Sequence, residues 1–127
     1  MIKQTYQANT KTATVSLFSL PSLESFTGLI NTTPVGMWPE DGQSPLTPIQ
    51  LETLPAGALV YDLIYRPTET RLLQDAKALG LHPVNGLDML LYQGVCSFEL
   101  WRGQAVPPEV IPPVRAQLLQ SLDKDIS

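Results

Sequence analysis

Residues 59–84 read LVYDLIYRPTETRLLQDAKALGLHPV, and this stretch decides the fold class. Its first part, Leu59 to Tyr65, is nearly continuous in apolar residues, which is typical of a parallel strand buried on both faces. The next part predicts a helix from Pro67 to Leu79, with Gly80 as the glycine that ends it. A short strand is predicted over His82–Val84. A strand, a helix and a second strand in this order predict a parallel pair with a right-handed crossover.

The residues before this unit predict further pieces of the same kind of sheet. The β-branched run Thr12–Phe18 predicts a strand. Leu20–Phe26 is interpreted as a short helix with Pro21 in its first turn. Gly28–Asn31 predicts a buried strand, and Val35–Gln50, rich in Pro, Gly, Asp and Ser, predicts an extended loop.

Two helices are expected after the unit. Leu87–Trp101 predicts a strongly apolar helix, and a last amphipathic helix should run from about Pro108 or Pro113 to Leu122. The fold class is therefore α/β, with a parallel sheet flanked by helices and two carboxyl-terminal helices. The sheet looks incomplete on its amino-terminal side, so we expect an open edge and an exposed apolar patch on the Leu87–Trp101 helix.

Composition narrows the classes of function. The chain has 127 residues, a net charge of −4, a pI of about 4.7 and no basic patch, which argues against nucleic acid as a partner. It has no apolar run of about 18 residues that could span a membrane and no secretory signal. A single cysteine, Cys96, excludes an internal disulfide, and a single histidine, His82, excludes multi-histidine metal sites. A cytoplasmic protein is expected.

Ligands of open α/β sheets bind beyond the carboxyl ends of the strands, and three such ends carry unusual residues. Asn31–Met37 offers an amide and hydroxyls, then a proline and a glycine that allow close backbone approach. Tyr65 is predicted to end its strand, with Leu63 on the same face. Asn85–Gly86 precedes a helix start, where backbone N–H groups are available. Turn chemistry alone also accounts for the first of these, and a half-buried aromatic for the second.

The predicted Leu87–Trp101 helix also has a narrow face opposite its apolar stripe. Met89, Gln93 and Cys96 lie on this face. A glutamine in that position is either a solvent-facing side chain or a ligand contact, and periodicity does not choose between them. Asp62 is expected to accept backbone hydrogen bonds near the cleft.

Several separated blocks of the chain resemble the shikimate dehydrogenase family, with its quinate/shikimate relatives. These are LINTTPVGM at Leu29–Met37, VYDLIY at Val60–Tyr65, NGLDML at Asn85–Leu90, and then Gln93, Phe98, Trp101 and Gly103. The blocks keep the family order from about Leu29 to Gly103, and Asn85 stands where the family usually has Asp. The resemblance covers the carboxyl-terminal half of the family only, and implies a partial Rossmann-like sheet.

The resemblance also implies an activity and a set of site residues. Such enzymes reduce 3-dehydroshikimate to shikimate with NADPH, on the route to chorismate and the aromatic amino acids. Carried over by position, the cofactor site would be lined by Thr33, Pro34, Val35, Leu63 and Gly86. Tyr65 and Gln93 would touch shikimate or 3-dehydroshikimate, with Met89 beside them. The choice between NADP and NAD, and between shikimate and quinate, stays open.

The parts of the family pattern that carry catalysis have no counterpart in these residues. We find no Ser-x-Ser motif, no catalytic lysine–aspartate pair and no glycine-rich turn. We therefore expect residues 1–85 to be a truncated NADP-binding portion with weak NADP affinity. Residues 86–127 should form helices that line the substrate cleft and pack toward an amino-terminal domain. The isolated chain should be inactive; it is alternatively a non-catalytic binding module, or half of a split enzyme that pairs with a separate amino-terminal half. Self-association is expected.

Overall fold

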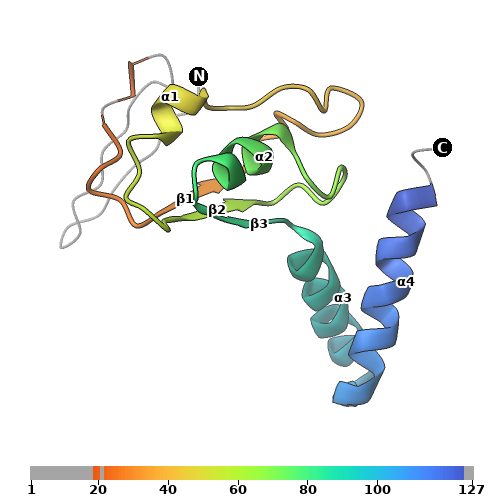
Figure 1. Ribbon diagram of the computed structural model, residues 1–127. Helices are drawn as coiled ribbons and strands as arrows, with labels where there is room; N and C mark the ends of the chain where they lie inside the picture. Colours follow the sequence, from red (N-terminus) through yellow and green to blue (C-terminus); the bar gives the residue numbers. More distant parts are fainter. Residues whose placement is uncertain (1–18, 21, 125–127) are drawn as a thin grey trace.

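The sheet of the molecule is parallel and three-stranded. The computed structural model describes residues 19–20 and 22–124, and Figure 1 shows β1 (Gly28–Asn31), β2 (Leu59–Asp62) and β3 (His82–Val84) in the order β1-β2-β3. In the register of the first pair, Asn31 lies opposite Asp62. The predicted α/β class and the presence of these three strands are confirmed, but the burial predicted for β1 and β2 is wrong: in β1 only Asn31 is buried, and β2 is buried on one face only. The strand predicted at Thr12–Phe18 lies outside the described residues.

One face of this sheet is covered by α2 (Arg71–Ala78), and the short helix α1 (Pro48–Leu51) packs against α2 (Figure 1). Apolar side chains from the sheet, both helices and the adjoining loops form the core between them: Leu23, Leu46, Leu51, Leu54, Ala58, Val60, Leu72, Leu73, Ala76 and Leu81. On the opposite face both Ile30 and Leu59 are exposed. The buried face therefore fixes which way the ends of the strands point their side chains.

Both helices begin where a threonine caps them. Thr47 and Gln50 form a reciprocal capping box at α1, which lies inside and just beyond the segment predicted to be a loop. Thr70, fully buried, caps α2, so this helix starts at Arg71 instead of Pro67. The helix expected over Leu20–Phe26 is absent from its described residues, which form turns and extended backbone.

Two longer helices project from the sheet as a hairpin. Figure 1 shows α3 (Leu87–Arg102) leading away from β3, and α4 (Ile111–Lys124) returning after the short 3₁₀ helix η2 (Pro108–Val110). Gly103 ends α3 with φ of 67°, a left-handed conformation that glycine adopts without steric cost. These are the two predicted carboxyl-terminal helices, and no described helix is long and apolar enough to cross a lipid bilayer.

An ion pair and one buried leucine hold α4 in place. Arg115 Nε donates to Asp88 Oδ1 at 2.6 Å, which joins α4 to the first turn of α3. The hydrogen bond to Asp88, and then its charge, raise the pKa of Arg115. Leu122, near the end of α4, is buried.

Most of α3 is not covered by other parts of the described structure. Only Leu87 and Leu91 are buried, both near its start. The exposed large apolar side chains of this helix are Met89, Tyr92, Phe98, Leu100 and Trp101. The last two are each 83% exposed, so α3 carries apolar surface toward solvent as the sequence predicted.

Candidate functional site: a groove beyond the strand ends

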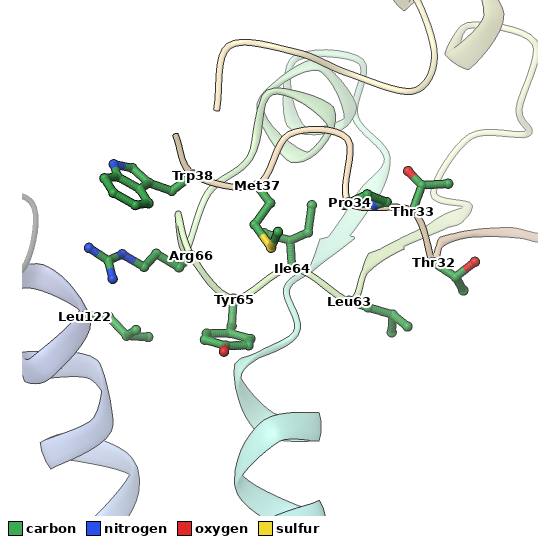
Figure 2. A pocket seen from close by; sticks show the side chains of 10 residues that line it. All are labelled: Thr32, Thr33, Pro34, Met37, Trp38, Leu63, Ile64, Tyr65, Arg66 and Leu122. Carbon is green, nitrogen blue, oxygen red and sulfur yellow. The ribbon is translucent and has the colours of Figure 1, made fainter. Parts of the chain in front are cut away.

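An open groove of about 450 Å³ lies just beyond the carboxyl ends of β1 and β2. Figure 2 shows the side chains that line it: Thr32, Thr33, Pro34, Met37, Trp38, Leu63, Ile64, Tyr65, Arg66 and Leu122. Residues 32–38, which follow β1, are here called the β1 wall, and residues 63–66, which follow β2, the β2 wall. This is the crevice in which open parallel sheets bind ligands.

The groove combines apolar surface with a few polar atoms. Pro34, Met37, Leu63 and Ile64 supply flat apolar contact, and Tyr65 is 38% exposed with its hydroxyl available to a ligand. Tyr65 does not end β2, however, because the strand stops at Asp62. The exposure of Tyr65 thus follows from its place in the wall beyond the strand.

A cation lies at the α4 end of the groove. The guanidinium of Arg66 lies over the ring of Trp38, 4.9 Å from its centroid, and Figure 2 shows both side chains near Leu122. In addition, the backbone N–H of Trp38 donates to the Arg66 carbonyl at 3.2 Å. These contacts close the two walls against each other at this end.

Beneath the walls, a buried polar network joins the ends of the two strands. Asn31 Nδ2 donates to Asp62 Oδ1 at 3.1 Å, and Thr70 Oγ1 donates to Asp62 Oδ2 at 2.7 Å. All three side chains are buried. Asp62 Oδ1 also accepts the backbone N–H of Ile64 at 3.1 Å, which confirms that Asp62 binds backbone near the cleft.

The β1 wall is shaped by the side chain of Asn31. Its Oδ1 accepts hydrogen bonds from both the backbone N–H and the hydroxyl of Thr33, at 3.0 and 2.7 Å. The Thr33 oxygen in turn accepts from the N–H of Val35 at 3.3 Å. Of the three wall residues predicted to bind a cofactor, Thr33 and Pro34 line the groove and Val35 does not.

Gly86 lies against the backbone of the β2 wall. A Cβ added to it would come 2.0 Å from the carbonyl oxygen of Leu63, and its N–H donates to the Ile64 carbonyl at 3.0 Å. Only glycine permits this approach. The next residue starts α3, so the position predicted to bind cofactor joins that helix directly to the groove.

The two predicted residues of α3 do not line the groove. Met89 is 46% exposed, and Gln93, four residues on and on the same side of the helix, is exposed. Gln93 Nε2 donates to the Leu90 carbonyl of its own helix at 3.0 Å. The structure thus brings Thr33, Pro34, Leu63 and Tyr65 together and leaves Met89 and Gln93 one and two turns along α3.

Several groove residues had no prediction attached to them. Trp38 and Arg66 each precede a proline, which holds a residue in extended backbone, and this signal could have marked them as wall residues. Leu122 could not have been found, because it reaches the groove only through the return of α4. In the described part of the chain, no group of three or more His, Cys, Asp or Glu could hold a metal ion.

Comparison with known proteins gives a consistent result. The family model for the Shikimate 5'-dehydrogenase C-terminal domain matches residues 86–119. The Shikimate dehydrogenase (NADP(+)) of Crocosphaera subtropica is 38% identical over 123 residues, which cover 94% of this chain and 43% of that protein. The corresponding protein of Thermosynechococcus vestitus is 52% identical over 83 residues, or 65% of this chain and 29% of that one.

Solved structures show the same fold. A shikimate 5-dehydrogenase of Thermus thermophilus, in complex with NADP(H) and shikimate, has a TM-score of 0.62 and 35% identity, covering 78% of this chain and 37% of that one. A shikimate dehydrogenase in complex with NADP+ has a TM-score of 0.69 and 33% identity, over 84% and 34%. The chain thus spans less than half the length of the relatives it matches, and their sheets are Rossmann-like.

Proposed function

This chain corresponds to the carboxyl-terminal part of the shikimate dehydrogenase family, and from that premise we propose that its groove is one wall of an NADP and shikimate site. The proposed whole activity is reduction of 3-dehydroshikimate to shikimate with NADPH. The observation that carries the proposal is that Thr33, Pro34, Leu63 and Tyr65 line one groove beyond the strand ends. They come from segments about thirty residues apart, so no local turn explains their meeting.

The groove fits the nicotinamide end of NADP. Leu63, Ile64 and Pro34 offer apolar contact to a flat ring, and the hydroxyls of the β1 wall suit a ribose. NADPH, when bound, supplies the hydride. In our proposal Leu63 orients the ring, Pro34 and Thr33 place the ribose, and Val35 shapes that wall. Gly86 lets α3 start close to the ring.

The substrate belongs, in this proposal, at the α3 side of the groove. The hydroxyl of Tyr65 would donate to the sugar acid, and Gln93 would hydrogen-bond one of its hydroxyls, with Met89 beside it. Gln93 must then leave its present bond to the Leu90 carbonyl, which an exposed side chain does at low cost. Residues 1–85 would thus form the cofactor side, and 86–127 the helices of the substrate side.

We propose further that these 127 residues alone bind weakly and do not turn over. By the resemblance, the family's lysine–aspartate pair belongs to its amino-terminal domain and its glycine-rich turn to the start of its cofactor domain. This chain matches the carboxyl-terminal part. A separate amino-terminal half would complete the site as a split enzyme. Mixing the chain with the amino-terminal part of the Crocosphaera relative would then restore NADPH consumption. If saturable binding persists but no such mixture turns over, the non-catalytic binding module is the better description.

Titration of the chain with NADP+ and with shikimate tests the site itself. Leu63→Ala should weaken NADP+ binding by about tenfold to a hundredfold, because a buried apolar contact is worth roughly 1.5–3 kcal/mol. Tyr65→Phe should weaken shikimate binding about tenfold and leave NADP+ unchanged, since it removes one hydrogen bond to the sugar acid. Ile49→Ala on α1, 76% exposed and remote, is the control. Absence of saturable binding to either ligand by the unmodified chain would contradict the proposal.

A further inference from the structure

We infer that Asp62 is a positioning residue that fixes the two walls of the groove relative to each other. The inference rests on the proposed function for the ligand that the walls hold. Asp62 does not line the groove, so it acts through other groups. Its carboxyl group is completely buried directly below both walls.

The first arm of the network reaches the β1 wall through Asn31. The Asn31 amide group donates to Asp62 Oδ1 at 3.1 Å, and its oxygen accepts two hydrogen bonds from Thr33. Because an amide has one donating and one accepting end, the donor bonds of Asn31 Nδ2 fix which end faces Thr33. These are the buried 3.1 Å bond to Asp62 and a longer 3.4 Å bond to the Val35 carbonyl. Through the shorter of the two, Asp62 contributes to the orientation of a residue that lines the groove.

The second arm reaches the β2 wall directly. The N–H of Ile64 donates to Asp62 Oδ1 at 3.1 Å, which bends the chain out of the strand immediately after Asp62. Leu63 and Tyr65 flank Ile64 and take their positions in the groove from this bend. A single carboxyl oxygen therefore holds one hydrogen bond toward each wall.

A third bond ties the same carboxyl group to the rigid part of the fold. Thr70 Oγ1 donates to Asp62 Oδ2 at 2.7 Å while it accepts the Leu73 N–H at the start of α2. Hydrogen bonds to a charged acceptor are shorter and stronger than neutral ones. The carboxyl group that contacts both walls thus also bonds the capping residue of α2, the helix that covers the sheet.

The prediction is a pattern of amide hydrogen exchange in the full chain. Asp62→Ala should raise exchange at Thr33 and Ile64 by about tenfold or more, because both lose a partner or its support. Asn31→Ala should raise exchange at Thr33 alone. Thr70→Val should spare both walls and raise exchange at Leu73. Asp62→Asn should restore much of the native pattern, since it keeps the shape and can donate to Thr70 Oγ1 in place of accepting.

Binding of NADP+ to the same variants gives the second readout. Asp62→Ala and Asn31→Ala should weaken it about tenfold, whereas Asp62→Asn and Thr70→Val should stay within about twofold. If Asp62→Ala does not fold, Asp62→Ser, which removes the same carboxyl group but keeps a polar side chain, takes its place with the same expected pattern. An equal rise in amide exchange at Thr33, Ile64 and the core residue Val60 in all variants would overturn the inference. Unchanged exchange at Thr33 and Ile64 in Asp62→Ala would overturn it as well. If the unmodified chain binds no NADP+, the proposed function fails, and the exchange pattern alone then supports or overturns the role of Asp62.

Discussion

At the scale of single residues, the contact between Gly86 and Leu63 is the tightest constraint near the groove. The α carbon of Gly86 leaves no room for a side chain, because the atoms it meets are backbone atoms of Leu63. Backbone cannot rotate aside as a side chain can. The glycine is therefore required by the packing of α3 against the β2 wall, whatever ligand the groove holds.

Gly86→Ala should consequently destabilise the protein by about 2–4 kcal/mol, the range of severe overpacking. Denaturant unfolding would measure it. Gly94→Ala is the control, since Gly94 lies within α3, the helix that Gly86 precedes, with nothing within 4 Å of an added Cβ. That control should gain up to about 1 kcal/mol from helix propensity. Equal effects at the two positions would show that the close approach is not a real constraint.

The bond between Asn31 and Asp62 could not be predicted from the sequence. The run Asn31–Met37 is recognisable as a site segment, yet the two side chains that shape it are joined across 31 positions of sequence. Spacing along the chain does not reveal such a pair, because the contact depends on the register of β1 with β2. The segments that line the groove were predictable, and so was the bond of Asp62 to backbone, but the Asn31–Asp62 bond beneath the walls was not.

At the scale of elements, apolar runs located the strands better than they located strand ends. The run Leu59–Tyr65 is continuous, but β2 stops at Asp62 because the Asp62 side chain captures the N–H of Ile64. The residues beyond are apolar because they line a groove. An apolar run indicates that residues are buried, but it does not show whether they belong to a hydrogen-bonded strand or to the β2 wall that follows it.

Tertiary hydrogen bonds also moved the start of α2 from the predicted Pro67 to Arg71. The carbonyls of Arg66 and Thr68, which an earlier start of α2 would have used, accept instead from the Trp38 N–H and from Asn85 Nδ2. The backbone N–H of Leu23 donates to Thr53 Oγ1, thirty residues further along the chain, and the residues around Leu23 form no helix. The cap of α1 was visible as Thr47 and Gln50, but lay in a proline-rich stretch interpreted as loop.

The ion pair between α3 and α4 allows a prediction at this scale. Its two side chains are 44% and 51% exposed, so screening should limit the coupling energy of an Arg115→Gln and Asp88→Asn cycle to about 0.5–1 kcal/mol. Amide exchange in α4 should rise in Arg115→Gln. The pair Arg71–Asp75, within α2, is the control and should leave α4 unchanged. Unaltered exchange in α4 would mean that Leu122 alone holds the helix.

The pH dependence of this pair follows from the sign of the shift. Asp88 raises the pKa of Arg115, so the stabilising contribution of the guanidinium is fully present below its unfolded pKa. It is lost only as the pH rises through the folded value, far above neutral. Deprotonation of Arg115 should therefore not change the free energy of unfolding across the neutral range.

At the scale of the whole molecule, the sheet body is packed and the α3–α4 hairpin is not. The core lies between the sheet and α1–α2, whereas α3 exposes five large apolar side chains. Such a surface favours association with another protein surface.

Self-association should follow, and light scattering at increasing concentration would detect it as a rising mean mass. Replacing Leu100 and Trp101 with glutamate should reduce the rise, because both side chains are 83% exposed and add apolar area without supporting the core. Ile49→Glu removes a similarly exposed apolar side chain from α1 and should change nothing. A monomer at every concentration would refute the prediction.

The opposition of Asn31 and Asp62 across the sheet has a consequence for how the chain finds its native pairing. If β1 paired with β2 one residue out of step, the side chains of β1 would turn to the opposite face. The carboxyl group would then be enclosed without its amide donor, an arrangement that costs several times a normal hydrogen bond. An apolar pair at the same place would tolerate either alignment. This polar pair therefore disfavours a one-residue shift in the pairing of the two strands.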